Sequence, residues 1–297
     1  MTSGVTKALI VLAALALNAQ RGLVTQLPPG NGPQTPSPTH ASVVYATTDG
    51  QKLRLDVYEP RKHNVPAPGI VLIHGGGFIE GDRSGMDDDA AELAHAGFVA
   101  FSIDYRLLQP HHRPVRNQWP AQLQDCQSAV RWIREHAAEY HVDPSKIGAY
   151  GHSAGGALAA LLGLTDSTGP AESSSLSRAQ AVVDLSGISD FTSDHDPEGD
   201  ALFTALFGGT EAQVPAVWRD ASPVYQVKPG DPPFLIVHGT RDQLVSIHQS
   251  EELEDALKKA GVTVKFLKVD DDHSLQNAVV RERILTQAAE FFRSALR

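Results

Sequence analysis

Short, continuous apolar runs alternate with amphipathic stretches along most of this chain, and this alternation constrains the fold more than any other feature. The runs are residues 70–73, 98–103, 147–150, 181–185, 234–237 and 264–269. Runs of this length, bounded by Gly or Asp, are typical of strands in a parallel sheet that is covered on both faces. Residues 53–58 instead alternate apolar and polar side chains, which indicates a strand with one exposed face.

The stretches between these runs repeat apolar residues every three or four positions, which is the period of a helix with one buried face. The clearest stripe lies in residues 122–140, and residues 154–164, 248–260 and 281–296 are also predicted to be helices. Strands that alternate with helices predict an α/β fold with a mostly parallel central sheet flanked by helices. In such a sheet, functional groups gather beyond the carboxyl ends of the strands.

The N-terminal segment predicts an export signal. Residues 8–17 are ten consecutive apolar residues that follow Lys7 and precede the small residue Ala19. The run is too short to span a membrane and fits a signal peptide over residues 1–19. Residues 20–41, which are rich in proline, are expected to be a tether to a catalytic domain at 42–297. We therefore expect a secreted or periplasmic protein; a docked N-terminal helix, and with it a cytoplasmic location, is the alternative.

Composition excludes several kinds of partner. The formal net charge of −10 argues against binding to nucleic acid, which requires clustered Lys and Arg. Cys126 is the single cysteine of the chain, so an internal disulfide and a multi-cysteine metal site are excluded. Cys126 belongs to the apolar stripe of its helix and is expected in the core. No cofactor, metal or membrane span is expected.

Residues 151–155 read Gly-His-Ser-Ala-Gly, between a predicted strand and a predicted helix. A serine on a sharp strand-to-helix turn is exposed at the edge of the sheet, and flanking glycines permit the tight turn. Ser153 is therefore a candidate nucleophile. The alternative is a glycine-rich turn that only packs a helix onto the sheet.

Residues 74–78 read His-Gly-Gly-Gly-Phe and directly follow the predicted strand 70–73. Successive glycines leave their backbone N–H groups uncovered, and such groups can stabilise the negative oxygen of a tetrahedral intermediate. The spacing does not match a dinucleotide-binding fingerprint. This segment is expected to pair with the amide of Ala154 as a donor loop.

A serine nucleophile requires a histidine base and a carboxylate that orients it, and with this type of turn both follow the serine in the chain. The histidines after Ser153 are His195, His238, His248 and His273. His273 is the preferred base because it follows the predicted strand 264–269, whereas His238 is expected to pack inside a strand end. Asp242 is the preferred acid and Asp190 its rival. The neighbouring residues 270–272, all Asp, are interpreted as a solvated loop rather than a metal site, and an acidic flexible loop around His195 is preferred over a cation site.

Together these motifs resemble the α/β-hydrolase superfamily, specifically HGGG-type esterases of the acetyl esterase and feruloyl esterase branch, related to the hormone-sensitive lipase family. The resemblance covers about residues 42–296, and it also rests on residues 104–107, on 119–121, and on Asp143 and Pro144. It implies Ser153 as nucleophile, Asp242 as acid and His273 as base. It implies oxyanion donors at the three positions Gly76, Gly77 and Ala154. No large N-terminal cap is expected, so segments 108–119 and 187–225 should form the walls of the site, the second as a small lid or as plain packing.

The leading hypothesis is a serine carboxylesterase that hydrolyses short-chain esters, or carbohydrate-linked or aromatic esters, through an acyl-enzyme. Its partner would then be a small-molecule or carbohydrate-bound ester, while the oligomeric state stays open. An amide hydrolase similar to arylformamidases is the second hypothesis. A non-catalytic binding protein with a hydrolase fold is the third, disfavoured because all three candidate triad residues are present.

Overall fold

The computed structural model describes residues 36–61, 65–166, 177–193 and 197–297. The predicted signal peptide, residues 20–35 of the predicted tether, and His195 lie outside these residues. Strand β1 (His40–Thr48) is the first described element, and His40 pairs with Val57 of β2 (Gln51–Tyr58). The last two residues of the predicted tether, His40 and Ala41, thus belong to strand β1.

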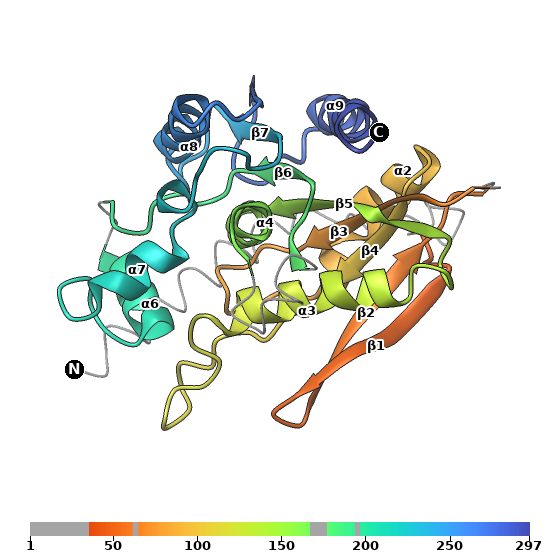
Figure 1. Ribbon diagram of the computed structural model, residues 1–297. Coiled ribbons are helices and arrows are strands. Elements are labelled where there is room, and N and C mark those ends of the chain that lie inside the picture. Colours follow the sequence, from red (N-terminus) through yellow and green to blue (C-terminus); the bar gives the residue numbers. More distant parts are fainter. Residues whose placement is uncertain (1–35, 62–64, 167–176, 194–196) are drawn as a thin grey trace, which may run out of the picture.

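An eight-stranded sheet forms the centre of the described chain, in the order β1-β2-β4-β3-β5-β6-β7-β8 (Figure 1). The strands after β2 are β3 (Ala67–Ile73), β4 (Val99–Ile103), β5 (Val142–His152), β6 (Ala181–Leu185), β7 (Phe234–Gly239) and β8 (Val264–Val269). Pairings from β4 to β8 are parallel, while β1–β2 and β2–β4 are antiparallel. The prediction of a mostly parallel sheet is confirmed.

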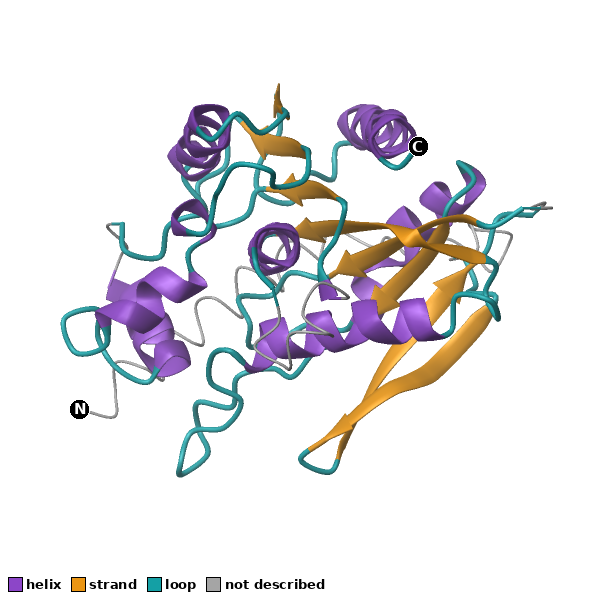
Figure 2. Cartoon of the chain, in the orientation of Figure 1, coloured by secondary structure: helices purple, strands orange, loops and turns teal. Residues whose placement is uncertain are grey.

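Helices cover both faces of this sheet (Figure 2). The helices α3 (Ala121–Glu135), α4 (Ala154–Leu164) and α8 (Ile247–Lys259) bury apolar side chains in one core cluster. The helices α2 (Asp87–His95) and α9 (Ala278–Ala295) bury theirs in a second cluster. Two further helices, α6 (Pro197–Phe207) and α7 (Pro215–Ala221), lie beyond the strand ends (Figure 1). No helix in the described ranges is long and apolar enough to cross a membrane.

Two predicted helices differ from the observed ones by more than one residue at an end. Helix α3 ends at Glu135 instead of residue 140, because the chain turns there and the amide of Val142 bonds the carbonyl of Ala137 at the entrance to β5. Helix α9 begins at Ala278 instead of residue 281, because the Asn277 side chain accepts hydrogen bonds from the first-turn amides.

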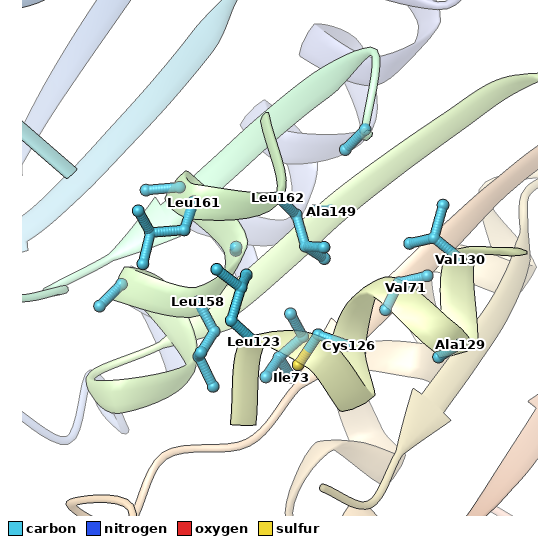
Figure 3. Close-up of a cluster of buried hydrophobic side chains, with 14 of the residues drawn as sticks. Val71, Ile73, Leu123, Cys126, Ala129, Val130, Ala149, Leu158, Leu161 and Leu162 are labelled. Carbon is cyan, nitrogen blue, oxygen red and sulfur yellow. The ribbon is translucent and has the colours of Figure 1, made fainter. Parts of the chain in front are cut away.

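The larger core cluster lies between α3, α4 and the central strands. Figure 3 shows Cys126 and Leu123 of α3 close to Ile73 of β3 and Leu158 of α4. Cys126 is fully buried and makes no disulfide, so its expected place in the core is confirmed. Burial raises the pKa of its thiol well above the ordinary value, so Cys126 has no thiolate character.

A buried ion pair fastens the segment after β4 to α3. The guanidinium of Arg106 donates to Asp125 with Nε–Oδ2 at 2.8 Å and Nη2–Oδ1 at 2.9 Å, and the Arg106 amide donates to Oδ2 at 2.9 Å. Both side chains are at least nine-tenths buried. Removal of Asp125 would leave the buried Arg106 with Asp49 as its remaining carboxylate partner, and the Asp49 side chain is largely exposed.

We expect Asp125→Ala to lower the free energy of unfolding by about 3–5 kcal/mol, the range for broken buried pairs. Lys146→Ala is the control, since the pair of Lys146 with Asp143 is about one-third exposed, and its loss should change stability by less than about 1 kcal/mol. Urea denaturation followed by circular dichroism measures both. Equal effects of the two variants would show that the Arg106 pair does not stabilise the fold as argued.

Candidate active site

Ser153 occupies a sharp turn between β5 and α4. Its backbone has φ 57° and ψ −121°, a conformation that L-residues rarely adopt. Gly151 and Gly155 have no room for a side chain: a Cβ on Gly151 would overlap the Gly155 carbonyl, and a Cβ on Gly155 would overlap the Ile73 carbonyl. The two glycines therefore allow the turn that holds the serine at the carboxyl end of β5.

Three predicted site residues meet at this end of the sheet. The Oγ of Ser153 lies 2.9 Å from Nε2 of His273, and Nδ1 of His273 lies 2.7 Å from Oδ2 of Asp242. A carboxylate only accepts hydrogen bonds, so Nδ1 carries the proton and Nε2 is free to accept one from Ser153. The row therefore has the arrangement of a nucleophile, a base and an orienting acid.

Asp242 is fixed through both of its oxygens. Its side chain is fully buried, and Oδ1 accepts hydrogen bonds from the amides of Leu244 and Val245, each at 2.9 Å. Oδ2 faces two imidazoles, that of His273 and that of His238 at 3.2 Å. Burial alone would raise the pKa of Asp242, but hydrogen bonds from His238 and His273 hold it well below its usual range. Asp242 is therefore a carboxylate at neutral pH.

The glycine loop lies against the serine. A Cβ built on Gly75 would be 3.2 Å from the Cβ of Ser153. Gly76 and Gly77 have φ values of 106° and 58°, and within the described part of the chain neither amide donates a hydrogen bond. Ala154 begins α4, so its N–H has no acceptor inside the helix. These amides are free for an oxyanion, and that role stays a prediction.

His152 joins the turn to the loop that carries the base. Its Nε2 lies 2.8 Å from the carbonyl oxygen of His273, and the two ring centroids are 5.0 Å apart. A carbonyl only accepts, so Nε2 carries the proton. Burial, together with the field of His273, lowers the pKa of His152 to about 4. The neutral ring thus links the turn of Ser153 to the loop of His273, although the two bonded residues are 121 positions apart in the sequence.

The lowered pKa of His152 predicts a pH-dependent stability. The unfolded chain binds this proton near pH 6.5, whereas the folded chain binds it only near pH 4. Stability is therefore expected to fall as the pH drops through this window, by up to about 1.4 kcal/mol per pH unit. His152→Gln removes the titrating group and should flatten the slope, as measured by urea denaturation at several pH values. An unchanged slope would exclude His152 as its source.

The rival acid Asp190 and the rival base His248 make their hydrogen bonds outside this row. Asp190 accepts hydrogen bonds from Thr192 and from the hydroxyl of Tyr225, and His248 is exposed and pairs with Glu251. Their positions favour Asp242 and His273 as the acid and the base.

The loop before His273 was expected to be solvated, and for Asp271 this is wrong. Asp271 is buried, and its carboxylate accepts hydrogen bonds from the amides of Asp272 and Asn277. These bonds close the loop that presents His273. No group of three or more metal-binding side chains occurs among the described residues.

The described residues of segment 187–225 pack against the glycine loop. Four of its aromatic side chains form one buried cluster, made of Phe191, Phe203, Phe207 and Trp218. Leu202 of α6 lies 3.7 Å from a Cβ built on Gly77. The loop 108–119 forms a second wall, since its Leu108 amide bonds the Phe78 carbonyl and its Trp119 amide bonds the Leu206 carbonyl.

The α/β-hydrolase class is defined by a serine on a strand-to-helix turn that is hydrogen-bonded to a histidine, which is in turn bonded to an aspartate. Here the histidine and the aspartate follow later strands of one mostly parallel sheet. A family model described as BD-FAE matches residues 55–257, and the chain belongs to this family.

Esterase LipC of Mycobacterium tuberculosis is 35% identical over 202 residues, which make up 65% of this chain and 49% of LipC. The chain thus spans about half the length of that relative. Est2 of Thermogutta terrifontis, an esterase solved with butyrate bound, has a TM-score of 0.74 and 28% identity over 88% of this chain and 95% of its own. A truncated carbohydrate esterase from gut microbiota has a TM-score of 0.76 and 28% identity, and the match covers 90% of this chain and 99% of that esterase.

The structure brings together the three predicted triad residues, and the glycine loop contacts Ser153 through Gly75. Sequence reasoning missed the parts that His152 and His238 play. The sequence holds no signal for either part, because both depend on contacts that form only in the folded chain.

Proposed function

We propose that this chain is a serine carboxylesterase that cleaves carboxylic esters through an acyl-enzyme. The observation that carries the proposal is the hydrogen-bonded row of Ser153, His273 and Asp242 beside a glycine loop with free amides. Membership in the BD-FAE family and similarity to proteins named as esterases support it. The alternative of a non-catalytic binding protein is less well supported, because the row is intact.

The geometry gives a role to each group. The Oγ of Ser153 attacks the ester carbonyl carbon while its proton passes to Nε2 of His273. The carbonyl oxygen becomes negative and accepts hydrogen bonds from the amides of Gly76, Gly77 and Ala154, each donor contributing roughly 3 kcal/mol of transition-state stabilisation. The tetrahedral species collapses as His273 returns the proton to the leaving alcohol. Water, activated by His273, then cleaves the acyl-enzyme and releases the acid and Ser153.

Short acyl groups on carbohydrate or aromatic alcohols are the proposed substrates. The butyrate complex of Est2 and the carbohydrate esterase of similar fold support this choice. Leu202 of α6, close to the glycine loop, supports an apolar wall for a short acyl chain.

Two measurements test the reaction class. A fluorophosphonate probe should add one adduct to the intact mass of the protein, because it reacts with activated serines. Turnover of p-nitrophenyl acetate should exceed that of a formanilide by orders of magnitude. No adduct and no ester turnover would favour a binding protein, whereas preferred formanilide cleavage would favour the arylformamidase-like alternative.

We also propose that residues 1–19 direct export to the periplasm or the medium. The supporting observation is the apolar run 8–17 between Lys7 and Ala19. N-terminal sequencing of the protein from the medium or periplasm should begin near residue 20. Intact Met1 in the cytoplasmic fraction would overturn this proposal.

A further inference from the structure

His238 lies behind the acid of the candidate triad and takes no direct part in the mechanism above. It belongs to β7, four residues before Asp242, and its side chain is fully buried. A buried imidazole that only filled space would leave two polar nitrogens unpaired, which is unfavourable. Both nitrogens of His238 instead have polar partners.

These partners fix the tautomer of the ring. Nε2 lies 3.0 Å from the Val245 carbonyl oxygen and 3.2 Å from Oδ2 of Asp242. Both of these atoms only accept hydrogen bonds, so Nε2 must carry a proton. Nδ1 lies 2.7 Å from the hydroxyl of Ser250 on α8, which is able to donate to it. A neutral His238 therefore satisfies every contact.

Asp242 thus has two imidazole nitrogens at one oxygen, Nδ1 of His273 at 2.7 Å and Nε2 of His238 at 3.2 Å, while the amides of Leu244 and Val245 bind the other oxygen. The single proton on Nε2 of His238 is shared between Oδ2 and the Val245 carbonyl oxygen. Four donors leave the carboxylate little freedom to rotate away from His273. A donor on Oδ2 also withdraws negative charge from the oxygen that faces His273, which limits how strongly Asp242 stabilises a protonated His273. The other titratable groups that interact electrostatically with His238 are Asp184 on β6 and His152.

We propose that His238 is a positioning residue for the esterase reaction: its Nε2–H holds the Asp242 carboxylate in line with His273 and moderates its charge. The inference rests on the proposed function for its kinetic consequences. The geometric part, two imidazoles on one carboxylate oxygen, is independent of substrate.

Two substitutions at position 238 distinguish the effect of the Nε2–H donor from the effect of side-chain packing. The amide nitrogen of Gln at 238 reaches about as far as Nε2, whereas the shorter Asn replaces only the Nδ1 side that faces Ser250. We expect His238→Asn to lower kcat for p-nitrophenyl acetate tenfold or more at unchanged KM, and His238→Gln to recover most of it. Ser250→Ala disturbs the same ring but leaves the Nε2–H donor, so its kcat should stay within about twofold of the wild type.

The pH profile gives a readout that a purely structural role would not move. With one donor fewer, Asp242 stabilises protonated His273 more strongly, so the acid limb of kcat/KM should move to higher pH in His238→Asn and not in Ser250→Ala. An NMR titration of His273 should show the same upward shift without any substrate. A folded His238→Asn variant with wild-type kcat and an unchanged His273 titration would overturn the proposal. Equal losses of kcat in His238→Asn, His238→Gln and Ser250→Ala would overturn it as well. An inactive wild type with a shifted His273 titration in His238→Asn would refute the esterase function but not the positioning.

Discussion

Ser153→Ala is expected to lower kcat/KM for p-nitrophenyl acetate by about a million-fold, the scale seen when a serine nucleophile is removed. The substitution removes the one oxygen that lies 2.9 Å from Nε2 of His273 and leaves the base, the acid and the glycine loop in place. No other described hydroxyl contacts this nitrogen. The fluorophosphonate adduct should disappear together with turnover, as measured by intact mass and by release of p-nitrophenol.

Ser186→Ala is the matched control for this variant. Ser186 shares a positive φ with Ser153, here 49°, but it is fully buried, whereas Ser153 is partly exposed. The hydroxyl of Ser186 has no hydrogen-bond partner within the described residues. Both variants exchange a serine for alanine at a left-handed position, so their thermal midpoints should shift little. Only Ser153→Ala should lose activity. A persistent adduct in Ser153→Ala would move the nucleophile elsewhere and refute the mechanism proposed above.

The central strands and the long helices were predictable from periodicity because their side chains are buried on a regular pattern. Helix α4 and strands β6 and β8 have the boundaries that their apolar runs predict. The position of Ser153, Asp242 and His273 at carboxyl strand ends followed from the same reasoning, because parallel strands bring their ends to one edge. The apolar pattern thus predicted the edge of the sheet at which the candidate site lies.

The elements that were not predicted lack such a pattern. Strand β1 buries only Tyr45 among its nine residues, because it lies at the sheet edge and pairs on one side. Helix α2 begins with Asp87, Asp88 and Asp89. Acidic residues are favourable in the first turn of a helix, but three in a row interrupt the apolar periodicity by which a helix is predicted. Helices α6 and α7 are short, and their aromatic residues predicted either a lid or packing without deciding between them.

The supporting histidines were beyond sequence reasoning for a different reason. Contact between His152 and the carbonyl of His273 joins residues 121 positions apart, and only the folded sheet brings them together. For His238, the apolar run around it predicted burial correctly, but a strand residue that is buried gives no sign of which side chain it faces. Partners in space, not residue types, distinguish a packed histidine from one that binds the acid.

Asp242→Asn is expected to lower kcat by about ten-thousand-fold at nearly unchanged KM, as for an orienting acid in a triad. The amide nitrogen of Asn is a donor, so where it replaces Oδ2 it favours the tautomer of His273 with a proton on Nε2. That nitrogen then cannot accept the proton of Ser153. Loss of the negative charge should also destabilise protonated His273, so the acid limb of kcat/KM should move to lower pH, opposite to the change expected for His238→Asn.

The same variant tests the low pKa of Asp242 through stability. A carboxyl whose pKa is depressed by folding stabilises the protein above its unfolded pKa of about 4, and this contribution is lost as the pH falls below that value. Asp242→Asn should therefore lose less stability between pH 5 and pH 3 than the wild type does. Asp190→Asn is the matched control, because the rival acid is bonded to Thr192 and Tyr225 rather than to His273. If Asp190→Asn abolished turnover while Asp242→Asn stayed within tenfold of the wild type, the acid would be Asp190, and the hydrogen bond between Asp242 and His273 would have a structural role only.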